Sequence, residues 1–248
     1  MPALRYRIVN VFAESALAGN PLCVFEDGSS LDTATMQALA LQFNLSETTF
    51  IVPPTVAGAT AQVRIFTPGF EMPFAGHPTL GTAHVVRELK NAGGSVKLEM
   101  KAGVIPVEAH GDEWTLKANA PRSHVPHVAR TEFAQMLGLP ESDVRDGALW
   151  VDTGSEQLIM PLASAEAVER CKPNAELLLR YSVGHKRNGL AYVWAHVDDR
   201  TIRARFFFTK HGGLVEDPGT GSACANLGGW HIAQGKTLPL DFKVMQGD

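Results

Sequence analysis

The stretch Glu71-Met-Pro-Phe-Ala-Gly76-His77-Pro78 recurs in the second half of the chain as Glu216-Asp-Pro-Gly-Thr-Gly221-Ser222-Ala223. The matching glutamate, proline and glycine are each 145 residues apart (216 − 71, 218 − 73, 221 − 76). An apolar run ending in threonine precedes each copy, and each copy opens a predicted helix. Similarity at a fixed offset is typical of an internal repeat. The repeat predicts two similar halves, 1–119 and 120–248, that face each other across a cleft.

The predicted elements follow similar orders in the two halves. Apolar residues in 32–43 recur at the i, i+3, i+4, i+7 spacing of an amphipathic helix, and Asp32 is placed to cap it. Many short strands with one small-residue helix per half favour an α+β fold, with a curled, mostly antiparallel sheet around each central helix. A doubly wound parallel sheet would need regular alternation of strands and helices. Strands are predicted at 5–12, 22–25, 48–53, 61–67, 95–101, 104–109, 113–118, 148–152, 157–161, 190–197 and 201–209. Helices are predicted at 32–43, 78–90, 131–137, 164–171 and 221–234, and 120–126 is expected to be a linker.

Composition excludes several classes of function. The 248 residues carry 22 Lys and Arg against 26 Asp and Glu, without a basic block, which argues against a nucleic-acid partner. No apolar run reaches the roughly 18 residues of a membrane helix. The cysteines at 23, 171 and 224 form no Cys-x-x-Cys pair, so we expect free thiols in a reducing cytoplasm. Metal binding is not expected, and metal, nucleotide and flavin motifs are absent from the sequence.

The two glycine turns are candidate ligand sites. Gly76 with His77, and Gly221 with Ser222, each open a helix, where free N–H groups and the helix dipole favour an anion. If a pseudo-twofold relates the halves, both helix starts converge on one cleft that suits a small carboxylated molecule. The alternative is that both are only good caps and tight turns.

Glu47 is a candidate acid–base residue. It stands between a predicted helix and the apolar strand that begins near Phe50. A carboxyl there would be partly desolvated, which favours its protonated form and suits proton transfer. The alternative is a surface or capping glutamate.

Four further polar residues have open roles. Asp217 could orient His77 or a substrate amine, or it could be a turn aspartate that serves its own helix start. His77 could donate a proton, donate a hydrogen bond to substrate, or be a structural histidine. Ser222 has no adjacent base in the sequence, which disfavours a nucleophilic role. Asn20 could be a turn residue or a polar anchor that faces the cleft.

The sequence resembles the phenazine-biosynthesis PhzF-like family in blocks that fall in the family's order from position 18 to position 223. These blocks are Ala18-Gly-Asn-Pro-Leu-Cys-Val-Phe25, Asn44-Leu-Ser-Glu-Thr-Thr-Phe50, Arg64-Ile-Phe-Thr-Pro68, Glu71-Met-Pro-Phe-Ala-Gly-His-Pro78 and Val215-Glu-Asp-Pro-Gly-Thr-Gly-Ser-Ala223.

The resemblance implies the diaminopimelate-epimerase-like fold, with the site between two pseudo-symmetric halves, a homodimer and no cofactor. The namesake enzyme isomerises trans-2,3-dihydro-3-hydroxyanthranilate by moving a proton. By similarity, Glu47 carries the proton, and His77, Asp217 and Ser222 bind or polarise the substrate. Gly76 and Gly221 then hold the carboxylate region of the substrate.

The sequence departs from its relatives in two respects. Related epimerases and racemases use one cysteine from each half as paired bases. The paired positions here are Gly76-His77 and Gly221-Ser222, and Cys224 has no mate, so a two-cysteine mechanism is disfavoured. Family members usually continue past a segment such as Val244-Met-Gln-Gly247. We therefore expect either a truncated sequence or a second half with an exposed sheet edge.

Three functions remain open on these grounds. The first is a cytoplasmic, cofactor-independent isomerase that uses Glu47, with dihydrohydroxyanthranilate as the default substrate. The second is an epimerase or racemase of an amino-acid derivative, with Glu47 and either Asp217 or His77 as opposed bases. The third is a non-catalytic protein that binds a small ligand.

Overall fold

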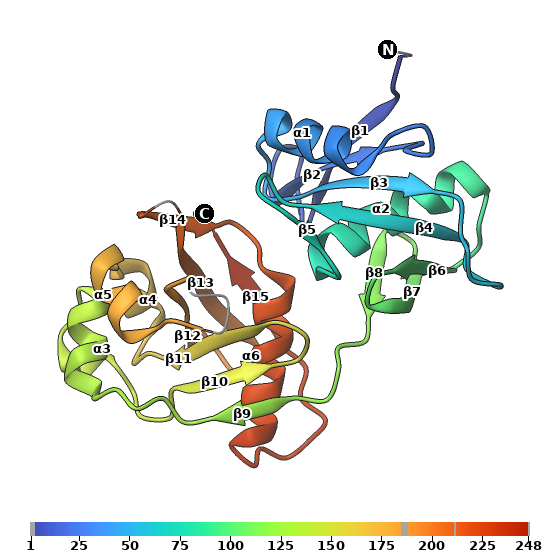
Figure 1. Ribbon diagram of the computed structural model, residues 1–248. Helices are drawn as coiled ribbons and strands as arrows, with labels where there is room; N and C mark the ends of the chain where they lie inside the picture. The colour runs from blue at the N-terminus through green and yellow to red at the C-terminus, as the bar shows by residue number, and fades with distance from the viewer. Residues whose placement is uncertain (1–2, 185–187, 211, 248) are drawn as a thin grey trace. The chain divides into compact units, whose positions relative to one another are not determined.

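The computed structural model describes residues 3–184, 188–210 and 212–247. The chain divides into two compact units, Met1–Lys117 and Ala118–Asp248. Each unit contains one sheet (Figure 1).

The first unit is a mixed sheet with one helix on each face. The sheet order is β1-β2-β3-β4-β6-β7-β8, with β5 added beside β4. Strand β2 runs parallel to β3, and β4 runs parallel to β6, while the other neighbours are antiparallel. The strands are β1 (Tyr6–Val11), β2 (Asn20–Phe25), β3 (Thr48–Val52), β4 (Ala61–Phe66), β5 (Glu71–Met72), β6 (Ser95–Met100), β7 (Gly103–His110) and β8 (Glu113–Leu116), and the helices are α1 (Thr33–Phe43) and α2 (Gly76–Lys90).

The two helices of this unit differ in burial. The Asp32 side chain accepts a hydrogen bond from the backbone N–H of Thr35, which confirms the predicted cap of α1. Helix α1 buries only Met36 and Ala40. Helix α2 buries nine of its 15 residues, because strands on several sides surround it. The sheet curls around α2, as Figure 1 shows, so α2 is the central helix of the unit.

The second unit has the same plan. Its sheet order is β14-β13-β12-β11-β10-β9, with β15 beside β13. Helices α4 and α5 pack against β12 and β13, and α6 packs against β9, β10 and β11. The strands are β9 (Arg122–His124), β10 (Leu149–Asp152), β11 (Glu156–Pro161), β12 (Leu190–His196), β13 (Thr201–Lys210), β14 (Gly213–Asp217) and β15 (Lys243–Gln246). The helices are α3 (Arg130–Leu137), the short 3-10 helix η1 (Glu141–Asp143), α4 (Ala165–Arg170), α5 (Ala175–Tyr181) and α6 (Gly221–Ala233).

The strand connections of the two units repeat. In the first, an antiparallel hairpin of β4 and β5 leads into α2, and the chain returns as β6 parallel to β4. In the second, a hairpin of β13 and β14 leads into α6, and the chain returns as β15 parallel to β13. The duplicated sequence motif therefore marks a duplicated hairpin–helix–strand unit.

The repeated glutamate of each motif is structural. Arg64 Nε and NH2 each donate to one carboxylate oxygen of Glu71 at 2.8 Å. In the second unit, Arg205 makes the same two-pronged pair with Glu216, at 2.8 and 2.7 Å. The arginines are 141 residues apart (205 − 64) and the glutamates 145 (216 − 71), so the second hairpin is four residues longer.

Some sequence predictions need correction. The segment 120–126, predicted as a linker, contains β9, which pairs with β10. Helix α2 begins at Gly76 rather than at residue 78, and Pro78 lies in its first turn. The elements α5, β5, β14 and β15 were not predicted. Strand β14 is mostly exposed and β15 pairs with a strand more than 30 residues away, so neither has a clear apolar pattern of its own.

Both sheets are mixed but mostly antiparallel, and each encloses one central helix. This confirms the α+β prediction and rules out the doubly wound alternative. In the described ranges, no helix is both long enough and apolar enough to cross a membrane.

Candidate active site

Three chain segments begin together in the first unit. Strands β2 and β3 are parallel neighbours, so both begin at the same end of the sheet. Asn20 is the first residue of β2, and Glu47 directly precedes β3. His77 is the second residue of α2, which packs on both strands. The parallel pairing therefore brings Asn20, Glu47 and His77 to one place.

Both ring nitrogens of His77 have partners within this unit. Nδ1 lies 3.0 Å from Glu47 Oε2, and Nε2 lies 3.1 Å from the backbone oxygen of Asn20. His77 is 5% exposed, and the Glu47 side chain is 18% exposed, so the pair is shielded but reachable. The ring of Phe12 lies 6.3 Å from the imidazole, centroid to centroid. Glu47 and Asn20 together orient His77.

These contacts fix the number of protons that Glu47 and His77 share. A carbonyl oxygen only accepts hydrogen bonds, so Nε2 of His77 carries a hydrogen that it donates to Asn20. In the neutral ring Nδ1 is then an acceptor, and Glu47 must be protonated to donate to it. In the cationic ring Nδ1 donates to a Glu47 carboxylate. Either way, one proton lies between Glu47 and His77.

The second unit places Asp217 at the start of α6. Thr220, the residue that precedes α6, donates its hydroxyl to Asp217 Oδ2. Gln246 donates to Thr220 Oγ1 at 2.8 Å and to the backbone oxygen of Asp217 at 2.9 Å. Asp217, the last residue of β14, is therefore bonded within the loop that leads into α6, and it does not cap that helix.

Gly221 and Ser222 are the first two residues of α6, as Gly76 and His77 are of α2. Within the described residues, no side chain caps either helix. The first N–H groups of both helices can therefore donate to a ligand.

Two residues that support Ser222 were not predicted from the sequence. Gln157, on β11, donates its side-chain amide to Ser222 Oγ at 2.8 Å. Asn226, on α6, donates in turn to Gln157 Oε1. Gln157 is 5% exposed and Asn226 is fully buried. The sequence offered one signal for them, because each is an amide residue within an apolar element. A buried amide needs a specific hydrogen-bond partner.

The units differ at the position of Glu47. When the two sheets are aligned by their strand registers, Thr48 matches Ala191. Glu47 and Leu190 directly precede these two residues, so they occupy equivalent positions. Leu190 is 8% exposed and cannot transfer a proton. Of these two equivalent positions, only the one in the first unit therefore carries a carboxyl. The aligning pairs are Thr48 with Phe66 and Phe66 with Glu71 in the first unit, and Ala191 with Phe207 and Phe207 with Glu216 in the second.

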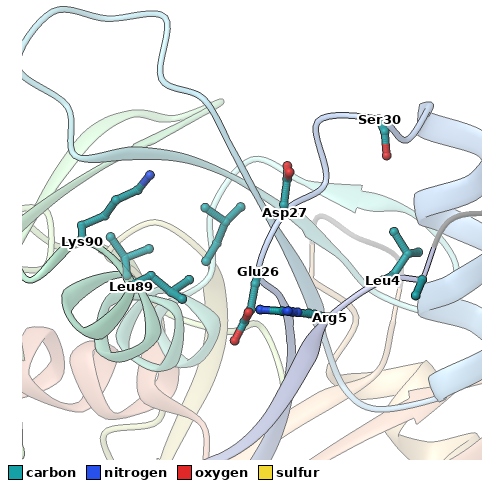
Figure 2. A pocket seen from close by; sticks show the side chains of 10 residues that line it. Leu4, Arg5, Glu26, Asp27, Ser30, Leu89 and Lys90 are labelled. Carbon is teal, nitrogen blue, oxygen red and sulfur yellow. The ribbon is translucent and has the colours of Figure 1, made fainter.

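Two pockets, each within a single unit, lie away from these residues. One, of about 520 Å³, lies in the first unit, and Figure 2 shows Arg5, Glu26 and Lys90 among the charged residues that line it. The other, of about 370 Å³, lies mainly along α6 and residues 238–244. The predicted site residues line neither pocket. The described residues contain no cluster of three metal-ligating side chains.

The buried thiols are poor bases. Burial raises the pKa of Cys23 and of Cys171 to about 12, so both stay protonated at neutral pH.

Two curled mixed sheets, each around one helix, define the diaminopimelate-epimerase-like fold. A phenazine biosynthesis protein of the PhzF family from Bacillus anthracis shares this fold with a TM-score of 0.82 and 26% identity. The alignment covers 94% of this chain and 81% of that chain. The chain belongs to the PhzC-PhzF family of phenazine biosynthesis-like proteins, whose pattern matches residues 9–248.

Named relatives agree with this assignment. An uncharacterized isomerase of Pasteurella multocida is 39% identical over 98% of this chain and 82% of its own length. A trans-2,3-dihydro-3-hydroxyanthranilate isomerase of Pseudomonas aeruginosa is 32% identical over 98% of this chain and 85% of its own length. The chain is an isomerase of the PhzF family.

Proposed function

We propose that this isomerase moves a proton between two carbons of a small carboxylated substrate, with Glu47 as the acid–base residue and without a cofactor. In the state with a Glu47 carboxylate and a cationic His77, Oε1 of Glu47 takes a proton from a substrate carbon. The double bond shifts, and Glu47 returns the proton at another carbon. Atoms and charge balance, because the substrate loses and regains one proton.

The observation that carries this proposal is the contact between Glu47 and His77, whose hydrogen bond needs one proton between the two side chains. The pair can hold it on either partner, because Nδ1 and Oε2 are 3.0 Å apart. A group that both gives and takes a proton is what an isomerisation requires. Anchoring of Nε2 on Asn20 keeps the imidazole in place through the exchange.

The asymmetry of the two units favours isomerisation over two-base racemisation. Racemisation needs a base on each face of the reacting carbon. Leu190 stands where a second carboxyl would stand by the internal repeat, and Asp217 is bonded to Thr220. One acid–base group that reaches two carbons on one face fits this arrangement better.

The proposed substrate is trans-2,3-dihydro-3-hydroxyanthranilate or a close analogue. The proposal draws on the activity named for the P. aeruginosa relative. Its carboxylate would be held at the starts of α2 and α6, at Gly76 and Gly221. Asp217 and Ser222 would bind its polar groups, and Asn20 would act through His77. The site between the two units, the homodimer and the cytoplasmic location stay predictions.

The test uses proton NMR in D₂O to follow turnover of this substrate by wild type, Glu47→Gln and Glu113→Gln. Glu113 is an exposed carboxylate on β8 and serves as the matched control. We expect turnover with deuterium at the reprotonated carbon in wild type and in the control, and none in Glu47→Gln. Turnover by Glu47→Gln at the wild-type rate would overturn the role of Glu47.

Two other outcomes would point to the alternatives. Inversion of a chiral amino acid with deuterium uptake would establish an epimerase. Tight binding of the substrate by wild type and Glu47→Gln alike, without exchange in either, would establish a binding protein.

A further inference from the structure

A chain of hydrogen bonds leads from buried backbone to the side chain of Ser222. The backbone N–H and the hydroxyl of Thr153 both donate to Asn226 Oδ1, at 2.8 and 2.7 Å. Asn226 Nδ2 donates to the backbone oxygen of Ser155 at 2.7 Å and to Gln157 Oε1. Gln157 Nε2 donates to Ser222 Oγ at 2.8 Å.

The chemistry of the backbone groups sets the direction of this chain. A backbone N–H can only donate, so the Asn226 atom that faces Thr153 is the oxygen. A backbone carbonyl can only accept, so the Asn226 atom that faces Ser155 is the nitrogen. The same nitrogen faces Gln157, which fixes Gln157 with its oxygen toward Asn226. Its nitrogen must then point to Ser222.

The direction determines what Ser222 can do. Its oxygen accepts from Gln157, so its own hydrogen is directed elsewhere. Among the residues that the structure describes, none accepts a hydrogen bond from Ser222 Oγ. The half-buried hydroxyl is thus held as a donor, which suits an acceptor oxygen such as a carboxylate and not a protonated ammonium group.

The first unit shows that the fold does not need these amides. Asn226 and Gly81 each lie five residues after the first residue of their helix, and Leu22 takes the place of Gln157. A Cβ at Gly81 would lie 2.7 Å from Leu22 Cδ2, so this pair is closely packed and apolar. The aligning pairs are Val24 with Thr49 and Thr49 with Ile65 in the first unit, and Ile159 with Tyr192 and Tyr192 with Phe206 in the second.

We propose that Gln157, fixed by Asn226, is a positioning residue that holds the Ser222 hydroxyl as a hydrogen-bond donor to a carboxylate of the ligand. Burying two amides is unfavourable unless they are fully bonded, and the apolar pair at the same positions of the first unit avoids that penalty. The amides therefore have a purpose beyond packing. This inference rests on the proposed function for the identity of the ligand.

The decisive variant is Gln157→Glu, which keeps the shape and the bond from Asn226 but replaces the donor by an acceptor. Ser222 would then turn its hydrogen inward, toward residue 157. The probe is 3-hydroxyanthranilate, a stable aromatic carboxylate, and 2-aminophenol is the matched probe without the carboxylate. Dissociation constants are measured by calorimetry for wild type, Gln157→Glu, Gln157→Leu, Ser222→Ala and the double variant.

We expect wild type to prefer the carboxylate probe, and Ser222→Ala to weaken its binding by about tenfold or more, as for a hydrogen bond to a charged group. Gln157→Glu should weaken it at least as much, and Gln157→Leu less, because a free hydroxyl can still turn to the ligand. Gln157→Glu should weaken binding of the carboxylate probe much less when it is added to Ser222→Ala than when it is added to wild type. The dissociation constant for 2-aminophenol should change little.

Thr153→Val provides a structural control. It removes one of the two bonds to Asn226 Oδ1 and leaves the backbone N–H, so the direction of the chain and the affinity should be unchanged. A purely structural role for the network predicts that Thr153→Val and Gln157→Leu weaken binding in proportion to their loss of thermal stability.

Three results would overturn the inference. The first is an equal loss of affinity when Gln157→Glu is added to wild type and to Ser222→Ala. The second is unchanged binding of the carboxylate probe by a folded Gln157→Glu protein. The third is a wild-type protein that shows no preference for the carboxylate probe. The proposed function fails separately, when no deuterium enters the substrate in the turnover experiment. The two failures are distinguishable, because this cycle measures binding and does not require turnover.

Discussion

Glu71 and Glu216 are structural equivalents, since each accepts a two-pronged ion pair from the arginine of its own hairpin. The arginines, Arg64 and Arg205, also lie over Phe66 and Phe207, at 5.1 and 4.6 Å from the ring centroids. The repeated glutamate therefore holds the hairpin that leads into each central helix. We propose that the chemistry lies a few residues further on, at the start of that helix.

Removing the charge at residue 71 should destabilise the protein. Glu71→Gln is expected to lower the free energy of unfolding by about 1–3 kcal/mol, because Arg64 would lose its partner. Glu216→Gln should lower it less, since the Glu216 side chain is 34% exposed and that of Glu71 is 10% exposed. Urea unfolding at pH 7 measures both. A larger loss in Glu216→Gln would contradict this ranking.

The same pair predicts a pH dependence. Hydrogen bonds from Arg64 lower the pKa of Glu71 below its ordinary 4.5. A lowered carboxyl pKa contributes stability that is present above the unfolded-state value and is lost as the pH falls through the folded-state value. The stability gap between wild type and Glu71→Gln should therefore shrink below about pH 4.5. A constant gap down to pH 2 would argue against it.

His77 should be required for turnover. His77→Gln can keep a hydrogen bond to Asn20 or Glu47 but cannot hold the shared proton, so kcat should fall by about 100-fold. His84→Gln, on the same helix, is the matched control, because His84 is partly exposed and contacts Glu88. Steady-state kinetics on the substrate of the turnover experiment measures both. An equal loss in the two variants would indicate a general effect on α2.

Two adjacent glycines of α6 should respond in opposite directions to alanine. A Cβ at Gly229 would lie 2.8 Å from Pro121 Cβ and 2.9 Å from Val151 Cγ1, so Gly229→Ala should destabilise the protein by about 1–3 kcal/mol. A Cβ at Gly228 meets no atom within 4 Å, so Gly228→Ala should stabilise it by up to about 1 kcal/mol through helix propensity. Thermal melts decide the signs, and two shifts in one direction would be inconsistent with this packing.

His231 should make stability fall in mild acid. Burial lowers its pKa to about 4, with smaller effects from His196 and Lys236. Between about pH 6.5 and 4 the unfolded chain binds a proton that the folded protein does not. The free energy of unfolding should therefore fall with pH, by up to about 3 kcal/mol in total.

His231→Phe is the matched variant for this effect, because the ring lies among Trp194, Trp230 and Phe242. Its stability should change less than that of wild type between pH 6.5 and 5, a range above most carboxyl titrations. Chemical unfolding at half-unit pH steps measures the two slopes. Identical slopes would show that His231 does not carry the effect.

Much of the fold could be predicted from the sequence. The helices α1, α2 and α6 have clear periodicity, caps or small-residue composition, and the buried strands are apolar runs. The missed elements have a common reason. The polar residues Arg122, Ser123 and His124 predict a crossover or linker, and they are exposed in the structure, so only pairing with β10 makes them strand β9.

The candidate site was predicted in part. Glu47 and His77 were singled out separately, and their contact depends on the parallel pairing of β2 with β3, which no local pattern reveals. Gln157 and Asn226 were not predicted, because a single buried amide has no periodic signal. Their importance is visible only when both are seen to meet Ser222.

The sequence by itself determined the duplication, the two central helices and the residue types at their first turns, because these are local features repeated at a fixed offset. The tertiary structure alone decided which polar groups meet. Glu47 and His77 are 30 residues apart, and Ser222 and Gln157 are 65 apart. Such contacts depend on strand order and register, and a shift of one residue would turn each side chain to the opposite face of its sheet.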